Sequence, residues 1–237
     1  MAQLNKKTLS IGAMLALSFL GVLILIFSPV FGEGKNGLMY SDDMFNKLSK
    51  GSSYFIPTVA KNNEKFNSTS VAVALKFDKP EQGTTALKVL AAAGIDVKSA
   101  SPDMTLNANL GAMMSKVLQD ADDMYKNDGK KIADRYGMNE KDALTSWWNV
   151  LKVMDKELKK QGKIEESNIV SEVMKKAIEP SFNFYKIDAQ QVSEKAGTMI
   201  GLLVFYVIYT MWWGFAIFYI FDGLGLTMKK AKVKKEV

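Results

Sequence analysis

The sequence predicts a mostly helical α+β protein in which two transmembrane helices flank a mainly helical extracytoplasmic domain that includes a small strand–helix–strand unit. Three observations predict this class. Two long apolar runs without a charged residue lie near the two ends of the 237-residue chain. The segment between them is polar and nearly neutral, and its apolar residues recur at spacings of three and four, as in amphipathic helices. One short stretch of it alternates residue by residue, as a strand does.

The first apolar run comprises the 24 uncharged positions 8–31, which follow the short segment 1–7. A helix of that length extends about 36 Å and covers a hydrocarbon core of about 30 Å. Pro29, together with Gly32 and Gly34, is expected to end it. A cleaved signal peptide is the alternative, but it has a shorter apolar core and a small-residue cleavage site, which the sequence around Pro29 does not offer. We therefore expect an uncleaved membrane helix.

The second apolar run comprises the 25 uncharged positions 197–221 and ends at Asp222, which is expected at the lipid headgroups. The tail 222–237 that follows is rich in lysine. By the positive-inside rule both termini are expected in the cytoplasm and the domain 32–196 outside it. In a Gram-negative cell the chain would be a two-pass protein of the inner membrane with a periplasmic domain. The lipid bilayer is then its first partner.

Small residues recur in both apolar runs at the spacing that lets membrane helices approach closely. The first run contains Gly12 and Ala16, and the second contains Gly197 and Gly201. We expect these positions to serve helix packing, and packing of the two helices against each other is the simplest form of it.

The second run also carries an aromatic face with polar tips. On a helical wheel, its five tyrosine and tryptophan side chains share an arc of about 140°, and a threonine falls in the same arc. A hydroxyl or indole N–H in hydrocarbon needs a hydrogen-bond partner, so this face is predicted to dock on another integral membrane protein or on a second copy of the chain. Interfacial aromatics with intramolecular packing, or a quinone or lipid slot, are the alternatives. The predicted docking residues are Thr198, Tyr206, Tyr209, Trp212, Trp213 and Tyr219.

The first half of the outer domain is predicted to form the strand–helix–strand unit. A short helix is expected over 41–51, followed by an irregular polar segment over 52–69. The alternating residues 71–77 predict a strand. A helix over 80–94, with proline in its first turn and a glycine at its end, leads to a second strand over 95–99. If the two strands are parallel, their connection is expected to be right-handed.

The second half of the outer domain is predicted to be helical. Apolar residues keep a helical spacing from Leu106 to Tyr125, and Trp147 and Trp148 lie in a later amphipathic stretch that Asn139 caps. One of the two tryptophans is expected in the core and the other exposed for a partner. The expected elements are helices over 106–125, 130–136, 140–161 and 169–177, the last ended by Pro180, a strand over 182–187, and a helix that runs from Asp188 into the membrane.

Composition excludes several kinds of chemistry. The chain has neither cysteine nor histidine, so thiolate and imidazole catalysis and most transition-metal sites are unavailable to it. It has one arginine, Arg135, and its excess positive charge flanks the apolar runs, which argues against nucleic-acid binding. Asp120, Asp122 and Asp123 form the densest acidic group, and we expect them on a solvated helix face with Lys116 one turn before Asp120. No enzyme activity, cofactor or metal site is predicted.

The topology of two membrane helices around an outer α/β domain is similar to that of polysaccharide chain-length regulators. Members of that family have a proline-rich segment at the second helix, whereas this chain has no proline after Pro180. The leading hypothesis is a non-catalytic accessory or scaffold subunit of a membrane complex of the transporter or respiratory type. The alternatives are an extracytoplasmic sensor or ligand-binding module and a homo-oligomeric envelope organiser, which the resemblance implies.

Overall fold

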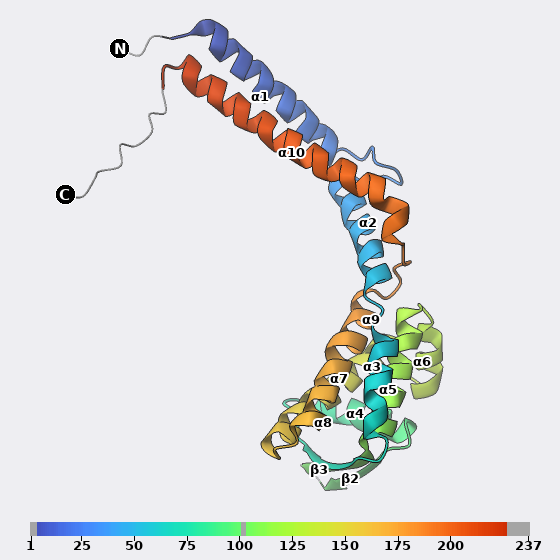
Figure 1. Cartoon of the computed structure of the whole chain (residues 1–237). Helices are drawn as coiled ribbons and strands as arrows, with labels where there is room; N and C mark the ends of the chain where they lie inside the picture. Colours follow the sequence, from blue (N-terminus) through green and yellow to red (C-terminus); the bar gives the residue numbers. More distant parts are fainter. Residues whose placement is uncertain (1–3, 101–102, 227–237) are drawn as a thin grey trace, which may run out of the picture. The chain divides into compact units, whose positions relative to one another are not determined.

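The computed structural model describes residues 4–100 and 103–226 (Figure 1). The chain forms two compact units. One comprises the residues up to Phe45 together with those from Gln191 onward, and the other comprises Asn46–Gln190. Helix is the dominant structure, at 73% of the residues, and the strands form a single small sheet, so the prediction of a mostly helical chain with a minor β component is confirmed.

The first unit is built on two long apolar helices, α1 (Lys6–Phe27) and α10 (Val192–Gly223), which run side by side (Figure 1). Both are long and apolar enough to cross a membrane. Asn5 caps α1 by accepting from the Thr8 N–H at 3.2 Å. The helix ends at Phe27, just before Pro29, rather than at residue 31, because a proline disfavours helical backbone at the residue before it. The helix predicted from Asp188 begins four residues later, at Val192.

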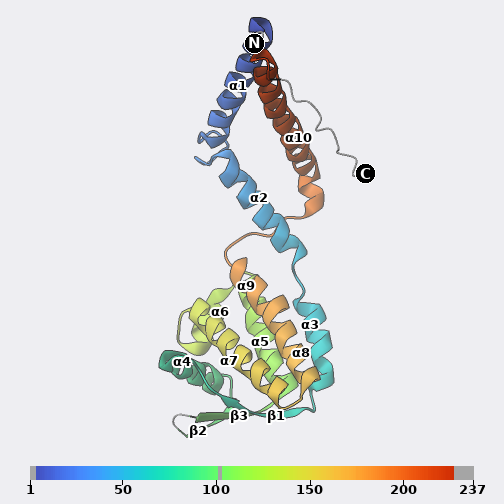
Figure 2. The ribbon, with the colours of Figure 1, turned by 90° about the vertical axis from the view of Figure 1, so that its left-hand side faces the viewer.

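The second unit is a helical layer on one face of a three-stranded sheet (Figure 2). The division between the units falls within α2 (Gly37–Ser52). The core of this unit includes Trp147, Leu144 and Met154, which are fully buried. The remaining helical elements are α3 (Ile56–Asn63), the 3₁₀ turn η1 (Glu64–Phe66), α4 (Pro80–Ala92), α5 (Leu110–Tyr125), α6 (Gly129–Tyr136), α7 (Glu140–Lys160), α8 (Ile164–Val173), the π-helical segment η2 (Met174–Ile178) and α9 (Glu179–Asn183).

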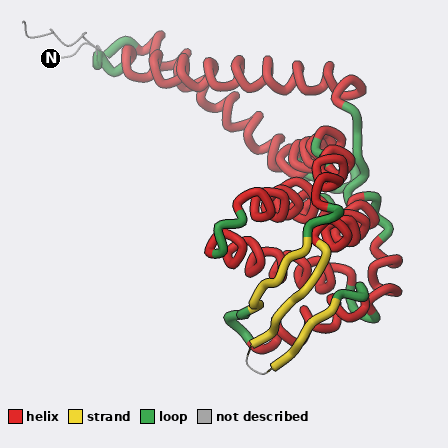
Figure 3. The backbone as a smooth tube through the Cα atoms, turned by 60° about the horizontal axis from the view of Figure 1, so that its bottom comes forward, coloured by secondary structure: helices red, strands yellow, loops and turns green. Residues whose placement is uncertain are grey.

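The sheet has the order β1-β3-β2 and is antiparallel throughout (Figure 3). Its strands are β1 (Ser70–Leu75), β2 (Asp96–Ala100) and β3 (Asp103–Asn109). The two predicted strands β1 and β2 are therefore parallel to each other but do not pair, because β3 lies between them. Alternate residues of β1, Val71, Val73 and Leu75, point into the core, as the period of two requires.

Two predictions in the first half of the domain are wrong. Residues 52–69 are not irregular, since α3 and η1 occupy most of them and bury Ile56, Val59 and Phe66. The helix expected from Leu106 begins only at Leu110, because residues 103–109 form β3. Leu106 and Leu110 are spaced like neighbours on a helix, but pairing with strands on both sides decides the backbone in favour of a strand.

Two predictions in the second half are also wrong. Pro180 does not end a helix: helical backbone runs on through α9, and the strand expected over 182–187 is absent. The backbone adapts at η2, where the Glu179 N–H bonds to the Met174 carbonyl one residue further back than in an α-helix. A wider turn before a proline avoids the clash between its ring and the carbonyl one turn earlier. It also accommodates the missing N–H donor, so the helix can continue.

Asp120 forms a buried polar cluster in the domain core, which contradicts the prediction of a solvated face. Its carboxylate accepts hydrogen bonds from the Arg135 guanidinium, from the Tyr136 hydroxyl and, at 2.8 Å, from the Trp147 indole N–H. The side chain is 1% exposed. Asp123, one turn further along α5, holds the other guanidinium nitrogen of Arg135 at 3.1 Å. A buried carboxylate is tolerated because each of its oxygens has a donor.

Lys50 ties the beginning of the domain to its end. Its ammonium group is buried and donates to the Asn127 side-chain oxygen at 2.9 Å and to the Phe184 and Ile187 carbonyls at 3.1 and 2.6 Å. The Tyr125 hydroxyl donates to the Lys50 carbonyl. Burial lowers the pKa of Lys50, and the charge of Asp188 partly counteracts this lowering. We call this group of contacts the Lys50 clamp.

Candidate docking surfaces

The aromatic face of α10 is divided between two environments. Tyr209 and Trp212 point to α1: the Tyr209 hydroxyl donates to the Phe19 carbonyl at 3.3 Å, and the Trp212 indole donates to the Leu15 carbonyl at 3.1 Å. The Phe19 ring stacks on that of Tyr209 with centroids 4.1 Å apart. These two predicted docking residues therefore have their partners within the helix pair.

Tyr206 and Trp213 lie at the edge of that contact and remain exposed on the helix pair, by 65% and 39% respectively. Within residues 4–100 and 103–226, nothing accepts a hydrogen bond from the Tyr206 hydroxyl or the Trp213 indole. The two positions are seven residues apart, so they lie on the same side of the helix. We call them the Tyr206–Trp213 stripe.

The other two predicted docking residues, Thr198 and Tyr219, are half-buried and lie towards opposite ends of the apolar run. Neither has a hydrogen-bond partner for its hydroxyl among the residues that the structure places. Near the end of a membrane span, water and headgroups can supply that partner. The two positions therefore give weaker evidence of a protein partner than the central stripe.

The small residues of the apolar runs also divide into two groups. Gly12 is buried, and a Cβ atom there would lie 2.6 Å from the Ile220 backbone nitrogen, so glycine permits a close crossing of α1 and α10. Ala16, one turn further, is half-buried. Gly197 and Gly201 have no atom within 4 Å of where a Cβ would be. These two are not part of the α1–α10 contact.

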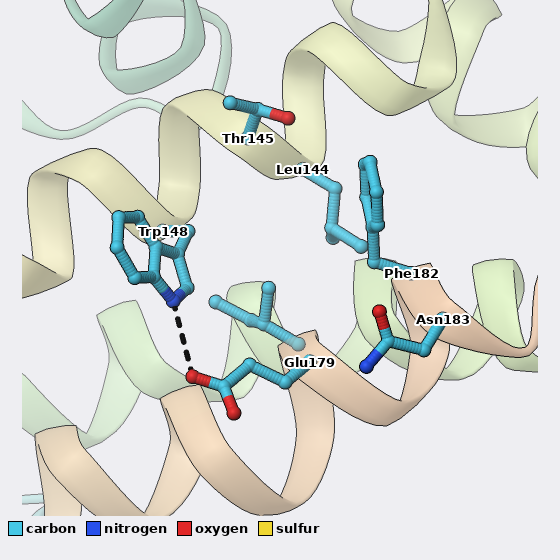
Figure 4. Close-up of a pocket in the computed structure, with 7 residues that line it drawn as sticks. Leu144, Thr145, Trp148, Glu179, Phe182 and Asn183 are labelled. Atoms are coloured by element: carbon cyan, nitrogen blue, oxygen red, sulfur yellow. Dashed lines mark hydrogen bonds between the residues drawn. The ribbon is translucent and has the colours of Figure 1, made fainter.

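The domain has a separate apolar groove between α7 and the η2–α9 segment (Figure 4). Leu144 and Ile178 line the groove, and Trp148 and Phe182 stand on opposite sides of it (Figure 4). The volume of the groove is about 190 Å³. Trp147 is fully buried whereas Trp148 is partly exposed at the groove, which confirms that the two tryptophans take different environments.

The charged side chains around this groove contact aromatic side chains. The ammonium groups of Lys141 and Lys152 lie over the Phe182 and Trp148 rings, 5.4 and 4.9 Å from their centroids. The neighbouring carboxylates accept from aromatic donors instead: Glu179 from the Trp148 indole at 3.3 Å, and Glu140 from the Tyr185 hydroxyl at 3.0 Å.

Hydrogen bonds to the carboxylate, from its own backbone N–H and from Tyr185, lower the pKa of Glu140. Burial, reinforced by the hydrogen bond to Glu140, raises the pKa of Tyr185. Both shifts favour a neutral hydroxyl bonded to an ionised carboxylate at this end of the groove.

The sequence does not predict the groove, because the alternating residues around Phe182 are typical of a strand. A usable signal was present in α7. Lys141, Thr145, Trp148 and Lys152 recur at spacings of three and four and form an outward stripe beside the buried one. The opposing wall of the groove is formed by α9. The sequence does not predict this helix, because Pro180 is expected to end the helix before it.

Among the residues that the structure describes, no three acidic side chains are grouped so that they could hold a metal ion. Comparisons of the chain with protein-family models, with curated protein sequences and with solved structures found no match.

Proposed function

We propose that this protein is a non-catalytic, membrane-anchored accessory or scaffold subunit of a membrane complex, and that it docks through the Tyr206–Trp213 stripe. In this proposal α1 and α10 cross the membrane, both chain ends are cytoplasmic, and the domain lies on the outer side. In a Gram-negative cell this places the protein in the inner membrane with a periplasmic domain.

The observation that carries the proposal is the depth of the unpartnered polar tips. Tyr206 lies three residues from the middle of the run 197–221, about 4.5 Å along the helix axis, and Trp213 lies about 6 Å from it on the other side. Half the thickness of the hydrocarbon core is about 15 Å. Headgroups and water are therefore remote from the backbone at both positions, and a second membrane protein is the remaining source of acceptors.

The helix pair itself supports the same conclusion. Carbonyl groups of α1 accept hydrogen bonds from Tyr209 and Trp212, which lie within about 4.5 Å of the middle of the run. Polar aromatic tips at this depth thus bond to protein where a carbonyl group lies within reach. Tyr206 and Trp213 are exposed on one side of α10 and form the surface on which a partner helix could dock.

Site-specific photo-cross-linking in the native membrane tests this proposal. A photoreactive phenylalanine analogue at Tyr206 should give one discrete protein adduct. The matched control is Phe218, which is 52% exposed and lies about 120° around the helix from Tyr206. The same analogue there should give lipid adducts only. Equal adducts at both positions, or lipid adducts alone at Tyr206, would contradict the docking stripe. An adduct of twice the chain mass would indicate a second copy rather than another protein, and would contradict an accessory role.

The topology has its own test, which benefits from the absence of cysteine. A single cysteine at Lys88 in the domain should react with a membrane-impermeant maleimide in intact spheroplasts. A single cysteine at Leu4 should react only after permeabilisation. The reverse pattern would contradict the proposed orientation without bearing on the stripe.

A further inference from the structure

We propose that the groove between α7 and the η2–α9 segment is a binding site for an acidic peptide segment of a partner protein, with one apolar side chain seated between Trp148 and Phe182. The inference deepens the proposed function, since it assigns a partner chemistry to the domain. It rests on residues of the Asn46–Gln190 unit alone.

The size of the groove selects the kind of occupant. Sites for small-molecule ligands have volumes of about 300–1,000 Å³. The groove, at about 190 Å³, is smaller and has room for one large side chain. Its lining is mainly apolar: Leu144 and Ile178 contribute to it, and two aromatic rings stand on opposite sides (Figure 4). Such an apolar pocket with aromatic walls suits a leucine, methionine or phenylalanine anchor.

Two lysine ammonium groups beside the groove favour acidic residues in the occupant. Lys141 and Lys152 contact aromatic rings and form no ion pair within the described part of the chain. The carboxylates nearby, Glu140 and Glu179, are already engaged by aromatic donors. Two ammonium groups are therefore available to incoming acids, and a lysine placed against a ring keeps its methylene stem packed while its charge stays accessible.

The spacing of the two lysines sets the geometry of the partner. They are 11 residues apart on α7, about 16 Å along the helix axis, and the groove lies between them. A partner segment would therefore place one acidic residue on each side of its apolar anchor. This could be a helix with acids about three turns apart or an extended segment with acids about five residues apart.

Thr145 offers a way to close the groove without disturbing the core. It is exposed and lines the groove from α7, whereas the neighbouring Leu144 is fully buried. A tryptophan at this position would cover the apolar lining, and the exposed site gives its ring room outside the core. The Thr145→Trp variant therefore removes the pocket and leaves the charges in place.

The experiment selects from a random 12-residue peptide library displayed on phage, with the full chain in lipid nanodiscs as bait and Thr145→Trp as counter-selection. We expect enriched peptides with an apolar residue between acids. They should bind the double variant Lys141→Glu/Lys152→Glu roughly tenfold more weakly or worse. The matched control, Lys88→Glu/Lys98→Glu, reverses two exposed lysines elsewhere and should bind as the natural chain does. Peptides with lysine in place of their acids should regain binding to the first double variant.

Four outcomes would overturn the inference: no enriched motif, enrichment of basic or uncharged motifs, equal losses in both double variants, or binding that survives Thr145→Trp. Self-association that the groove variants abolish would instead assign the surface to a second copy, and would also overturn it. None of these outcomes involves α10, so failure here is distinguishable from failure of the photo-cross-linking at Tyr206.

Discussion

Asp120→Ala should destabilise the domain more than any other single loss of a carboxylate in α5. Asp120 is 1% exposed and is the acceptor for the Trp147 indole, the Tyr136 hydroxyl and the Arg135 guanidinium. Its removal leaves buried donors without their acceptor and a cation without its nearest counter-charge. Breaking a buried ion pair on one side costs about 3–5 kcal/mol, and we expect a loss in that range.

Asp123→Ala is the matched control, since Asp123 contacts the same guanidinium from the same helix, at 3.1 Å. Burial raises the pKa of the Asp123 carboxyl above its ordinary value of 3.8, against the opposing effect of Lys131. The cost of burying this carboxylate therefore offsets its ion pair with Arg135. We expect Asp123→Ala to change the free energy of unfolding by no more than about 1 kcal/mol.

Hydrogen exchange measured by mass spectrometry on the full chain in nanodiscs can separate the two variants, because it resolves α5 and α7 individually. A loss of about 3–5 kcal/mol corresponds to exchange faster by about two to three and a half orders of magnitude, since about 1.4 kcal/mol is a factor of ten. Amides of α1 should not change. If Asp120→Ala and Asp123→Ala accelerate exchange equally, the buried cluster is not what stabilises this part of the core.

Two further predictions concern the helix pair and alkaline pH. Gly12→Leu should loosen the α1–α10 contact by about 1–3 kcal/mol, because its Cβ would lie 2.6 Å from the Ile220 nitrogen. Exchange of α1 amides should accelerate, whereas Gly201→Leu should leave it unchanged, and the opposite ranking would refute the crossing point. Burial raises the pKa of Tyr125 and Tyr136 above 10.0, so the unfolded chain ionises first and the domain should lose stability as pH rises above about 10. Denaturation at several pH values should show that decline, and an unchanged or rising stability would contradict it.

The apolar helices could be predicted from the sequence because their signal is local. An uncharged run of sufficient length needs no tertiary partner to be identified. The start of α7 is also a local signal. The Asn139 side chain accepts from the Lys141 N–H at 2.9 Å, and α7 begins where predicted. Buried alternation in β1 likewise follows from neighbouring residues alone.

Elements fixed by distant partners could not be predicted in this way. Leu106 and Leu110 have a helical spacing, but β3 exists because it pairs with strands on both sides. Asp120 has Lys116 one turn before it in the sequence, yet its real partners are Arg135 and Trp147, 15 and 27 residues away. Local spacing favoured a solvated face, whereas tertiary packing buried the carboxylate.

The candidate docking surfaces show the same limit. The helical wheel grouped Tyr206 with Tyr209, since they are only one turn apart. Only the position of α1 distinguishes them: Tyr209 bonds to the Phe19 carbonyl, and Tyr206 remains exposed. The groove depends on α9, and its outer wall forms because the π-helical segment carries the helix through Pro180.

The Lys50 clamp has a mechanical consequence. It joins α2 to the chain at Phe184 and Ile187, and the Gln190 N–H donates to the Lys47 carbonyl at 3.1 Å beside it. The segment that enters the domain and the segment that leaves it are thus held together at one place. Tension applied to both segments would act on the hydrogen bonds of the Lys50 clamp before it reached the sheet. A force that separates the two segments would break the Lys50 contacts first, so that the domain would begin to unfold where the chain enters and leaves it.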